Sequence, residues 1–360
     1  MRILQLSSAR HFGGGERHFV DLTIGLAERG HELFVALIPD SPLLSSLKTL
    51  PNQNVFQLPF TNALNIASVW GLAKFARENR IEIIHAHMGR DYPLAALTAS
   101  RARGAKLVIT RHVLFTLGQI HKLTRRRVSR VIAVSEAVAL ALRRQNIFDE
   151  QTIRVVHNGI DLRRFAVCEK KGERTGGPLR VGMLGELSPV KGQTDFVRAA
   201  ALIVQQNSNV QFVIAGKDNS ADGNNRRELE ELIRTSGLED RVTLIESDIE
   251  VPSFLKTLDV FVSASHSEAF GLAIVEAMAA GLPVVATMTE GASEIIDDGR
   301  TGLLAPIGDA EQLAERINRL LMDAAQRDSL GNNARQTVAE CFALDRMIEE
   351  TENVYREAVL

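Results

Sequence analysis

Short apolar runs alternate with amphipathic segments of helical length along most of the chain. In the first half, strands are predicted at residues 3–6, 33–38, 81–85, 107–110, 131–134 and 155–157. Helices are predicted between them at residues 15–29, 67–79, 92–103 and 136–145. Because apolar runs and helical segments follow one another, the pattern predicts parallel βαβ units, in which helices cover both faces of a sheet.

The alternation stops at residues 168–178, which are polar, charged and glycine-rich, and then begins again. In the second half, strands are predicted at residues 179–184, 210–215, 242–245, 260–263, 284–286 and 302–304. Helices are predicted at residues 191–206, 225–236, 272–280 and 309–322, with a last amphipathic helix at 345–359. The sequence therefore predicts two doubly wound α/β domains, residues 1–167 and 179–344, joined by a linker.

Composition supports a globular protein with two cores. The chain has 360 residues, of which 45% are hydrophobic and 24% charged, so a disordered protein is excluded. Cys168 and Cys341 have neither metal-ligand nor disulfide-framework spacing. The first apolar segment is too short for a secretory leader, and the sequence has no run of about 18 apolar residues. We therefore expect a cytoplasmic protein without a spanning helix.

Charge is distributed unevenly between the two halves. Residues 1–161 contain 21 Lys and Arg against 12 Asp and Glu, a net +9, whereas the remainder carries 21 against 32, a net −11. The basic half also contains a cluster formed by Lys122, Arg125, Arg126, Arg127 and Arg130. Such a half suits an anionic partner, which leaves open a membrane surface, a phosphorylated acceptor, nucleic acid, or simply a solvated face.

The most informative segment is SEAFGLAIVEAMAAGLPVVA, residues 267–286. It contains two carboxylates, Glu268 before the predicted helix and Glu276 about one turn inside it. The unpaired N–H groups at the start of a helix favour an anion, and Gly271 allows a ligand to approach the backbone. The segment therefore suits a phosphate with polyols on either side, although an ordinary helix with two incidental acids has the same local pattern.

This segment resembles the Glu-x7-Glu motif of retaining glycosyltransferases of family 4, which have the two-domain GT-B fold. The resemblance implies that Glu276 binds the nucleotide ribose and that Glu268 contacts the donor sugar. It also implies that Phe270, Gly271 and Leu272 hold the diphosphate. The same resemblance, which covers nearly the full length, implies two Rossmann-like domains facing a cleft. The C-terminal helix, residues 345–360, is then expected to cross back onto the first domain.

The first predicted strand is followed by the glycine-rich turn HFGGGERH, residues 11–18. It does not complete the Gly-x-Gly-x-x-Gly pattern, because His18 stands where the last glycine would be, and this disfavours a dinucleotide site. It resembles the Gly-Gly-x-Glu loop of family 4, which implies that Gly14 and Gly15 lie near the donor phosphates. Glu16 either contacts the acceptor or stabilises the start of the helix.

Histidines end two strands of the first half. In Thr110-Arg111-His112, the resemblance implies that His112 lies beside the donor sugar; the alternative is a histidine bonded to a loop carbonyl. His85 and His87 alternate on one strand face, so a metal pair is conceivable. Because no third ligand lies nearby in the sequence, these two histidines are interpreted as lining the cleft or as structural, and no metal site is predicted.

The second half supplies further phosphate-binding candidates. In GELSPVKG, residues 185–192, Lys191 is placed to meet a phosphate, whereas Glu186 replaces the arginine usual in the family. Gly216 ends a strand and matches a glycine that lines the nucleotide site in the family. The chain has no Asp-x-Asp pair for a metal-bound diphosphate, so metal-independent chemistry is expected, with backbone N–H groups and Lys191 acting instead.

These observations predict a retaining glycosyltransferase that moves a hexose from a nucleotide-diphosphate sugar to an acceptor hydroxyl. We expect a glycolipid or lipopolysaccharide-type acceptor of the cell envelope, no resident cofactor, no nucleic acid partner, and peripheral contact with the inner face of an anionic membrane. Two alternatives remain: another enzyme on the same fold, such as a nucleotide-sugar epimerase or a phosphorylase, or a non-catalytic nucleotide-sugar-binding partner of another transferase.

Overall fold

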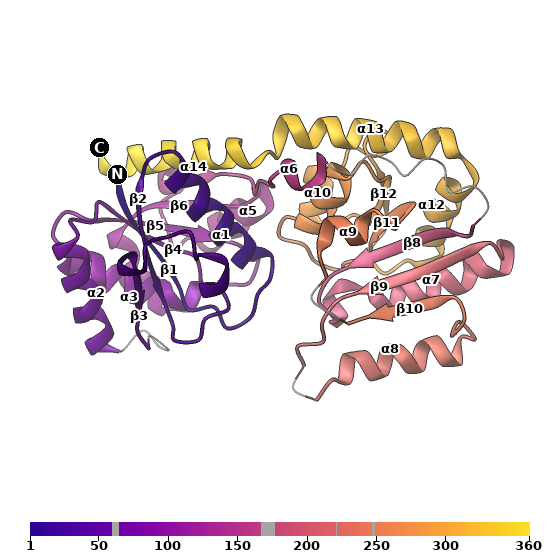
Figure 1. The fold of residues 1–360 in the computed structure, drawn as a ribbon, viewed down its shortest axis with the longest axis horizontal. Coiled ribbons are helices and arrows are strands. Elements are labelled where there is room, and N and C mark those ends of the chain that lie inside the picture. Colours follow the sequence, from indigo (N-terminus) through magenta and orange to yellow (C-terminus); the bar gives the residue numbers. More distant parts are fainter. Residues whose placement is uncertain (60–64, 167–176, 221, 247–248) are drawn as a thin grey trace. The chain divides into compact units, whose positions relative to one another are not determined.

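The computed structural model describes residues 1–59, 65–166, 177–220, 222–246 and 249–360 (Figure 1). The chain divides into two compact units: unit 1 is Met1–Ile160 with Leu344–Leu360, and unit 2 is Asp161–Ala343. Residues 168–176 of the expected linker, including Cys168, lie outside the described residues. The units therefore divide at residues 160 and 161, before the expected linker.

Unit 1 contains a seven-stranded parallel sheet with the strand order β3-β2-β1-β4-β5-β6-β7. The order reverses between β1 and β4, which makes this pair the topological switch point where open α/β sheets bind ligands. The strands are β1 (Arg2–Ser7), β2 (Glu32–Leu37), β3 (Val55–Gln57), β4 (Ile83–Ala86), β5 (Lys106–Arg111), β6 (Val128–Ala133) and β7 (Ile153–Val155). The helices are α1 (Gly14–Glu28), α2 (Ile66–Glu78), α3 (Tyr92–Arg101), α4 (Ile120–Thr124), α5 (Glu136–Gln145) and α14 (Leu344–Val359).

The last helix, α14, belongs to unit 1, where it packs against α1, β5 and β6 (Figure 1). Its apolar positions recur at helical spacing, and Met347, Ile348 and Tyr355 are buried in the core of unit 1. Gly25 allows α1 to approach closely, since a Cβ there would lie 2.2 Å from Ile348 Cδ1. The expectation that the C-terminal helix returns to the first domain is confirmed.

Unit 2 contains a six-stranded parallel sheet with the order β10-β9-β8-β11-β12-β13, so its switch point lies between β8 and β11. The strands are β8 (Leu179–Leu184), β9 (Val210–Ala215), β10 (Val242–Ile245), β11 (Val260–Ser263), β12 (Val284–Thr287) and β13 (Leu303–Ala305). The helices are α6 (Arg163–Ala166), α7 (Gln193–Gln206), α8 (Asn224–Thr235), α9 (Val251–Leu255), α10 (Leu272–Ala279), α11 (Glu290–Ile295), α12 (Ala310–Met322) and α13 (Ala324–Cys341). Two Rossmann-like units, as predicted from the alternating pattern, are therefore present.

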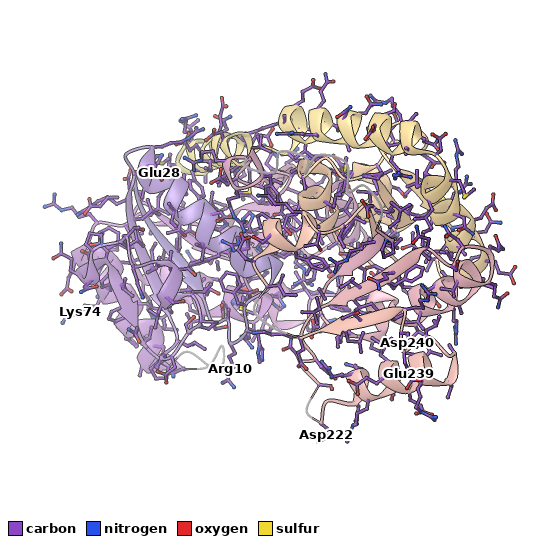
Figure 2. The ribbon with its side chains drawn as sticks, turned by 45° about the vertical axis from the view of Figure 1, so that its right-hand side comes forward. Arg10, Glu28, Lys74, Asp222, Glu239 and Asp240 are labelled. Carbon is purple, nitrogen blue, oxygen red and sulfur yellow. The ribbon has the colours of Figure 1, made fainter. Side chains whose placement is uncertain are left out.

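Charged side chains cover the surface of both units. Figure 2 shows Glu28 and Lys74 on unit 1, and Asp222, Glu239 and Asp240 on unit 2, all of them exposed. In the part of the chain that the structure describes, no helix is both long and apolar enough to cross a membrane.

Candidate functional site

In unit 2, the loops after β8 and β11 bring Lys191 and Glu268 together at the switch point. Lys191 Nζ donates a hydrogen bond to Glu268 Oε1 at 2.5 Å, across 77 positions of sequence. Ser265 Oγ donates to the same oxygen at 3.0 Å. The Lys191 side chain is 30% exposed and that of Glu268 15%, so both groups remain open to a ligand. Two residues that the sequence singled out separately thus form one charged pair.

Neighbouring residues fix these two loops against each other. The backbone N–H of His266 donates to Val190 O at 2.7 Å, and His266 Nε2 lies 2.6 Å from Asp195 Oδ2. A Cβ on Gly192, whose φ is +69°, would lie only 1.9 Å from Ala264 O. Sequence reasoning missed His266 and Asp195. The position of His266, three residues after the end of the predicted strand 260–263, was the available signal.

The expected anion-binding helix is α10, which begins at Leu272 after Gly271. Gly271 has φ +112°, a conformation that glycine adopts readily, and the helix start leaves N–H groups for an anion. Phe270 is buried against the ring of Phe342, so only its backbone is available to a ligand. Glu276 lies one turn inside α10 and is half-buried. The turn that contains Glu268 therefore leads directly into the start of α10, and Glu276 follows one turn later.

A glycine in α11 supports the turn that contains Glu268. A Cβ on Gly291 would lie 2.7 Å from both Glu268 O and Phe270 O, and Gly291 N donates to Glu268 O at 3.2 Å. Gly216 has a similar role after β9, because a Cβ there would lie 1.8 Å from Gly185 O. These contacts give both glycines a packing role beneath the candidate site.

Glu186, which replaces the arginine usual in the family, is exposed and accepts a hydrogen bond from Asn219 Nδ2 at 3.1 Å. It therefore places a carboxyl group in the same loop as Lys191.

In unit 1, four histidines gather near the switch point between β1 and β4. His85 and His87 come from β4 and the residue that follows it, His112 follows β5, and His18 lies on α1. The ring centroids of His85 and His87 are 4.0 Å apart, and those of His18 and His112 are 4.7 Å apart. Burial lowers the pKa of His18 to about 4 and holds the pKa values of the other three well below their usual range. All four imidazoles are therefore neutral near pH 7.

His85 is fully buried, and both of its ring nitrogens have partners. Nδ1 lies 2.6 Å from Tyr355 Oη on α14, and Nε2 lies 2.7 Å from Thr110 Oγ1 on β5. The sequence left two roles open for His85, lining the cleft or a structural role. Because both ring nitrogens bond to other side chains of unit 1, the geometry supports the structural role. His87 is also buried, whereas His112 is half-buried and adjoins Gly15, where a Cβ would lie 3.7 Å from the imidazole.

The glycine-rich turn leads directly into α1, which begins at Gly14. Glu16 Oε2 accepts a hydrogen bond from the backbone N–H of Gly13 at 3.0 Å, so this side chain caps the helix. Burial raises the pKa of the Glu16 carboxyl despite that bond. Of the two roles expected for Glu16, helix stabilisation is therefore the one seen in the geometry.

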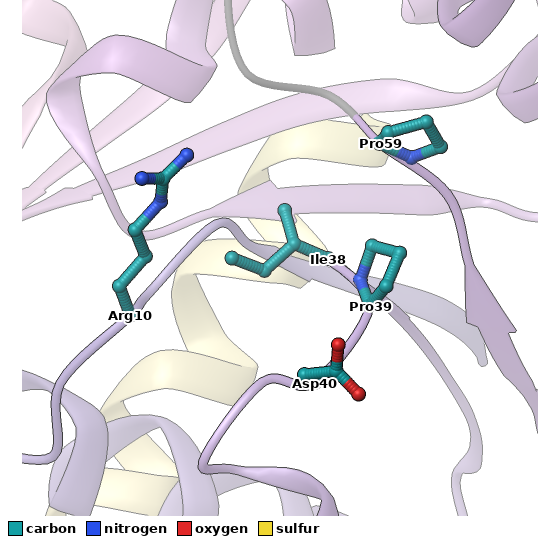
Figure 3. A pocket seen from close by; sticks show the side chains of 5 residues that line it. All are labelled: Arg10, Ile38, Pro39, Asp40 and Pro59. Atoms are coloured by element: carbon teal, nitrogen blue, oxygen red, sulfur yellow. The ribbon is translucent and has the colours of Figure 1, made fainter.

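A small pocket of about 290 Å³ lies beyond the carboxyl ends of β1, β2 and β3 in unit 1 (Figure 3). Its lining combines a cation, an acid and apolar carbons: Arg10, Ile38, Pro39, Asp40 and Pro59. Because Arg10 and Asp40 are both exposed, the pocket offers polar groups of both charges at the ligand-binding edge of the sheet.

The basic cluster expected from the sequence is only partly a free surface. Arg130 Nε lies 3.1 Å from Glu357 Oε2 on α14, and Arg154 contacts the same carboxylate, so Arg130 forms an internal ion pair. The other members, Lys122, Arg125, Arg126 and Arg127, are exposed. Phe115 and Leu123, in the same stretch, are 76% and 84% exposed. We refer to these six exposed residues of the 115–127 segment as the basic-apolar patch.

Comparison with known proteins agrees with the two-part organisation. Residues 168–337 match the family model "Glycosyl transferases group 1", and residues 12–164 match "Glycosyltransferase Family 4". The D-inositol 3-phosphate glycosyltransferase of Paenarthrobacter aurescens is 31% identical, over 78% of this chain and 74% of that protein. The lipopolysaccharide core biosynthesis mannosyltransferase LpcC of Rhizobium leguminosarum is 30% identical, over 80% of this chain and 77% of that protein. The crystal structure of Anabaena Alr3699/HepE in complex with UDP has a TM-score of 0.86 at 25% identity, covering 98% of this chain and 99% of that one.

Proposed function

The chain belongs to glycosyltransferase family 4, and on that premise we propose that it transfers a hexose from a nucleotide-diphosphate sugar to an acceptor hydroxyl with retention of configuration. The predicted family and GT-B fold are confirmed. The acceptor that we propose is a cell-envelope glycolipid or lipopolysaccharide-type glycan, supported by the similarity to the mannosyltransferase LpcC. Support for the nucleotide comes from Alr3699/HepE, which was solved with UDP.

The observation that carries this proposal is the Lys191–Glu268 pair beside the start of α10. In the proposed complex, the N–H groups of Gly271 and Leu272 bind the diphosphate, and Glu276 binds the ribose. Lys191 turns from Glu268 towards the phosphate, where it stabilises the charge that grows as the glycosidic bond breaks. Glu268, released from that pair, contacts the donor sugar.

The proposed reaction is a same-face displacement. The bond between the anomeric carbon and the phosphate oxygen breaks while the acceptor oxygen bonds to the same face of that carbon. The acceptor proton passes to the leaving diphosphate, so no separate base or metal ion is required. His112, which is neutral at pH 7, is proposed to donate or accept a hydrogen bond at the sugar.

Acceptor binding is proposed for unit 1. The pocket lined by Arg10 and Asp40 has groups suited to polar, hydroxyl-rich molecules. The basic-apolar patch is proposed to attach the protein reversibly to an anionic membrane, because its cations attract the lipid headgroups while Phe115 and Leu123 enter the interface.

A thermal-shift screen of UDP, GDP, ADP and their sugars, followed by calorimetry, tests the donor assignment. The correct nucleotide stabilises the folded state by about 2.7 kcal/mol at 100 times its Kd. Glu276→Gln should weaken its binding by about 1.5–3 kcal/mol, the range for hydrogen bonds to charged groups. Unchanged affinity in this variant contradicts the ribose assignment. Binding without any slow hydrolysis of the sugar indicates a non-catalytic protein.

A further inference from the structure

The fold brings together three histidines that are distant in sequence. One ring nitrogen from each of His18, His87 and His112 lies within 4.8 Å of the others. Their ring centroids are 4.7, 5.6 and 5.8 Å apart, and they come from α1, the end of β4 and the end of β5. Sequence proximity had offered no third ligand to accompany His85 and His87. The fold places two others, His18 and His112, beside His87. His85 is excluded as a ligand because both of its ring nitrogens have hydrogen-bond partners.

The hydrogen bond between His87 and Gln5 leaves the other ring nitrogen of His87 with a lone pair that faces away from Gln5. Gln5 Nε2 donates to Tyr355 Oη at 3.2 Å, so Gln5 Oε1 is the acceptor for His87 Nε2–H at 2.7 Å. His87 Nδ1 therefore has no proton, and this buried atom has no hydrogen-bond partner among the described residues. An imidazole fixed in this way, with its far nitrogen bonded to an amide oxygen, is the arrangement typical of metal ligands.

The other two histidines present the same feature. Both ring nitrogens of His18, which is 3% exposed, are buried with the Asn158 side chain as a polar neighbour, and Nε2 of His112 is buried without a hydrogen-bond partner in the described parts of the chain. Unpaired buried polar atoms are uncommon in native proteins, because burying one without a partner costs free energy. Three such imidazoles around one point form a donor set that a single cation satisfies.

We propose that His18, His87 and His112 bind a divalent transition-metal ion of the Zn²⁺ class, with a water molecule or a substrate oxygen completing its coordination. Neutral imidazoles are ligands that Zn²⁺, Cu²⁺, Ni²⁺ and Co²⁺ accept, whereas Mg²⁺ prefers oxygen. Zinc–nitrogen bonds of about 2.1 Å in a tetrahedron separate two ligand nitrogens by roughly 3.4 Å. The three ligand nitrogens, which lie within 4.8 Å of one another, therefore need to approach by up to about 1.4 Å to close on the ion, and the half-buried His112 is its point of entry.

The consequence for activity rests on the proposed function. Because His112 is proposed to contact the donor sugar without a metal, an ion that occupies its nitrogen competes with that contact. Zn²⁺ is therefore inhibitory, and turnover continues when a chelator removes it. Metal binding itself does not depend on the protein being a transferase, so the two ideas fail separately.

Titration of the full-length protein with Co²⁺ tests the site, because Co²⁺ in a low-coordinate imidazole site has strong visible absorption bands. We expect one equivalent to produce these bands and one equivalent of Zn²⁺ to abolish them. His112→Ala, at a half-buried position, should lose the bands while the circular dichroism spectrum is retained. His11→Ala, which removes an exposed histidine of the glycine-rich turn before α1, should leave them unchanged.

A second variant tests the role of the network rather than of a ligand. Gln5→Met removes the acceptor that fixes the His87 ring and should weaken Zn²⁺ binding by roughly 10–100-fold, as for other groups that orient metal ligands. Calorimetry of the folded variant measures this change. Absence of the Co²⁺ bands in the wild type overturns the proposal. Equal Zn²⁺ binding by the wild type and His112→Ala also overturns it and shows adventitious binding only.

Discussion

Replacing Lys191 with alanine should separate catalysis from folding. The cation contacts Glu268 at 2.5 Å, but the two side chains are 30% and 15% exposed, and Ser265 Oγ still donates to the carboxylate after the change. A partly exposed pair of this kind contributes on the order of 1 kcal/mol or less to stability. Loss of a donor that stabilises charge in the transition state costs about 10²–10³-fold in turnover, or about 2.7–4 kcal/mol. The expected effect on the reaction barrier thus exceeds the effect on folding.

Initial rates of nucleoside diphosphate release, measured across donor concentrations, give kcat and KM separately for Lys191→Ala. Urea unfolding gives the stability of the same variant. Lys256→Ala, which removes an exposed lysine at the end of α9, is the matched control and should change neither quantity. A variant with unchanged kcat and a raised KM shows that Lys191 binds the ground state and the transition state equally, which refutes the catalytic assignment.

Three further changes have defined outcomes. Gly291→Ala places a Cβ 2.7 Å from two backbone oxygens of the turn, so it should lower the free energy of urea unfolding by about 1–3 kcal/mol and lower donor affinity. Gly118→Ala, whose Cβ would have no described atom within 4 Å, is the control and should change neither quantity. A fully active Gly291→Ala protein contradicts the packing role. Burial raises the pKa of Asp91 from 3.8 to about 6, so the folded state holds a proton that the unfolded state has released. Stability should therefore fall by about 3 kcal/mol as pH rises from about 4 to 6, and the same titration of Asp91→Asn should lack that fall. Simultaneous Arg125, Arg126 and Arg127→Ala should weaken binding to phosphatidylglycerol vesicles by about 3 kcal/mol at low salt; equal flotation of wild type and variant removes the membrane role of the basic-apolar patch.

Hydrophobic patterning predicted the sheets because parallel strands buried on both faces form continuous apolar runs. Strands β8 to β11 have the predicted bounds. The edge strand β3 was missed because three half-exposed or exposed residues make no pattern. Helix α13 was missed because its 18 residues are mostly polar and include Gly331. That glycine has a packing reason, since a Cβ there would lie 2.2 Å from Gly281 O at the end of α10.

The candidate site shows the same division between local and non-local information. The local pattern identified Lys191 and Glu268, but their contact depends on β8 and β11 being neighbours in the sheet. Likewise, His18 and His112 approach His87 because β1, β4 and β5 are adjacent and α1, which carries His18, follows β1. Arg130 was grouped with its sequence neighbours, whereas its partner Glu357 arrives with the C-terminal helix. Residue types were thus predictable from the sequence, but partners set by strand order were not.

The central claim, retaining transfer from a nucleotide-diphosphate sugar, is tested most directly by following the anomeric carbon. Purified protein is incubated in EDTA with UDP-, GDP- and ADP-linked α-hexoses, and the sugar first released or transferred is observed by proton NMR. The account predicts that one donor is consumed, that its nucleoside diphosphate appears, and that the new anomeric signal is α. A first product with the β configuration, or folded protein that consumes a donor only when Mg²⁺ is restored, would contradict it.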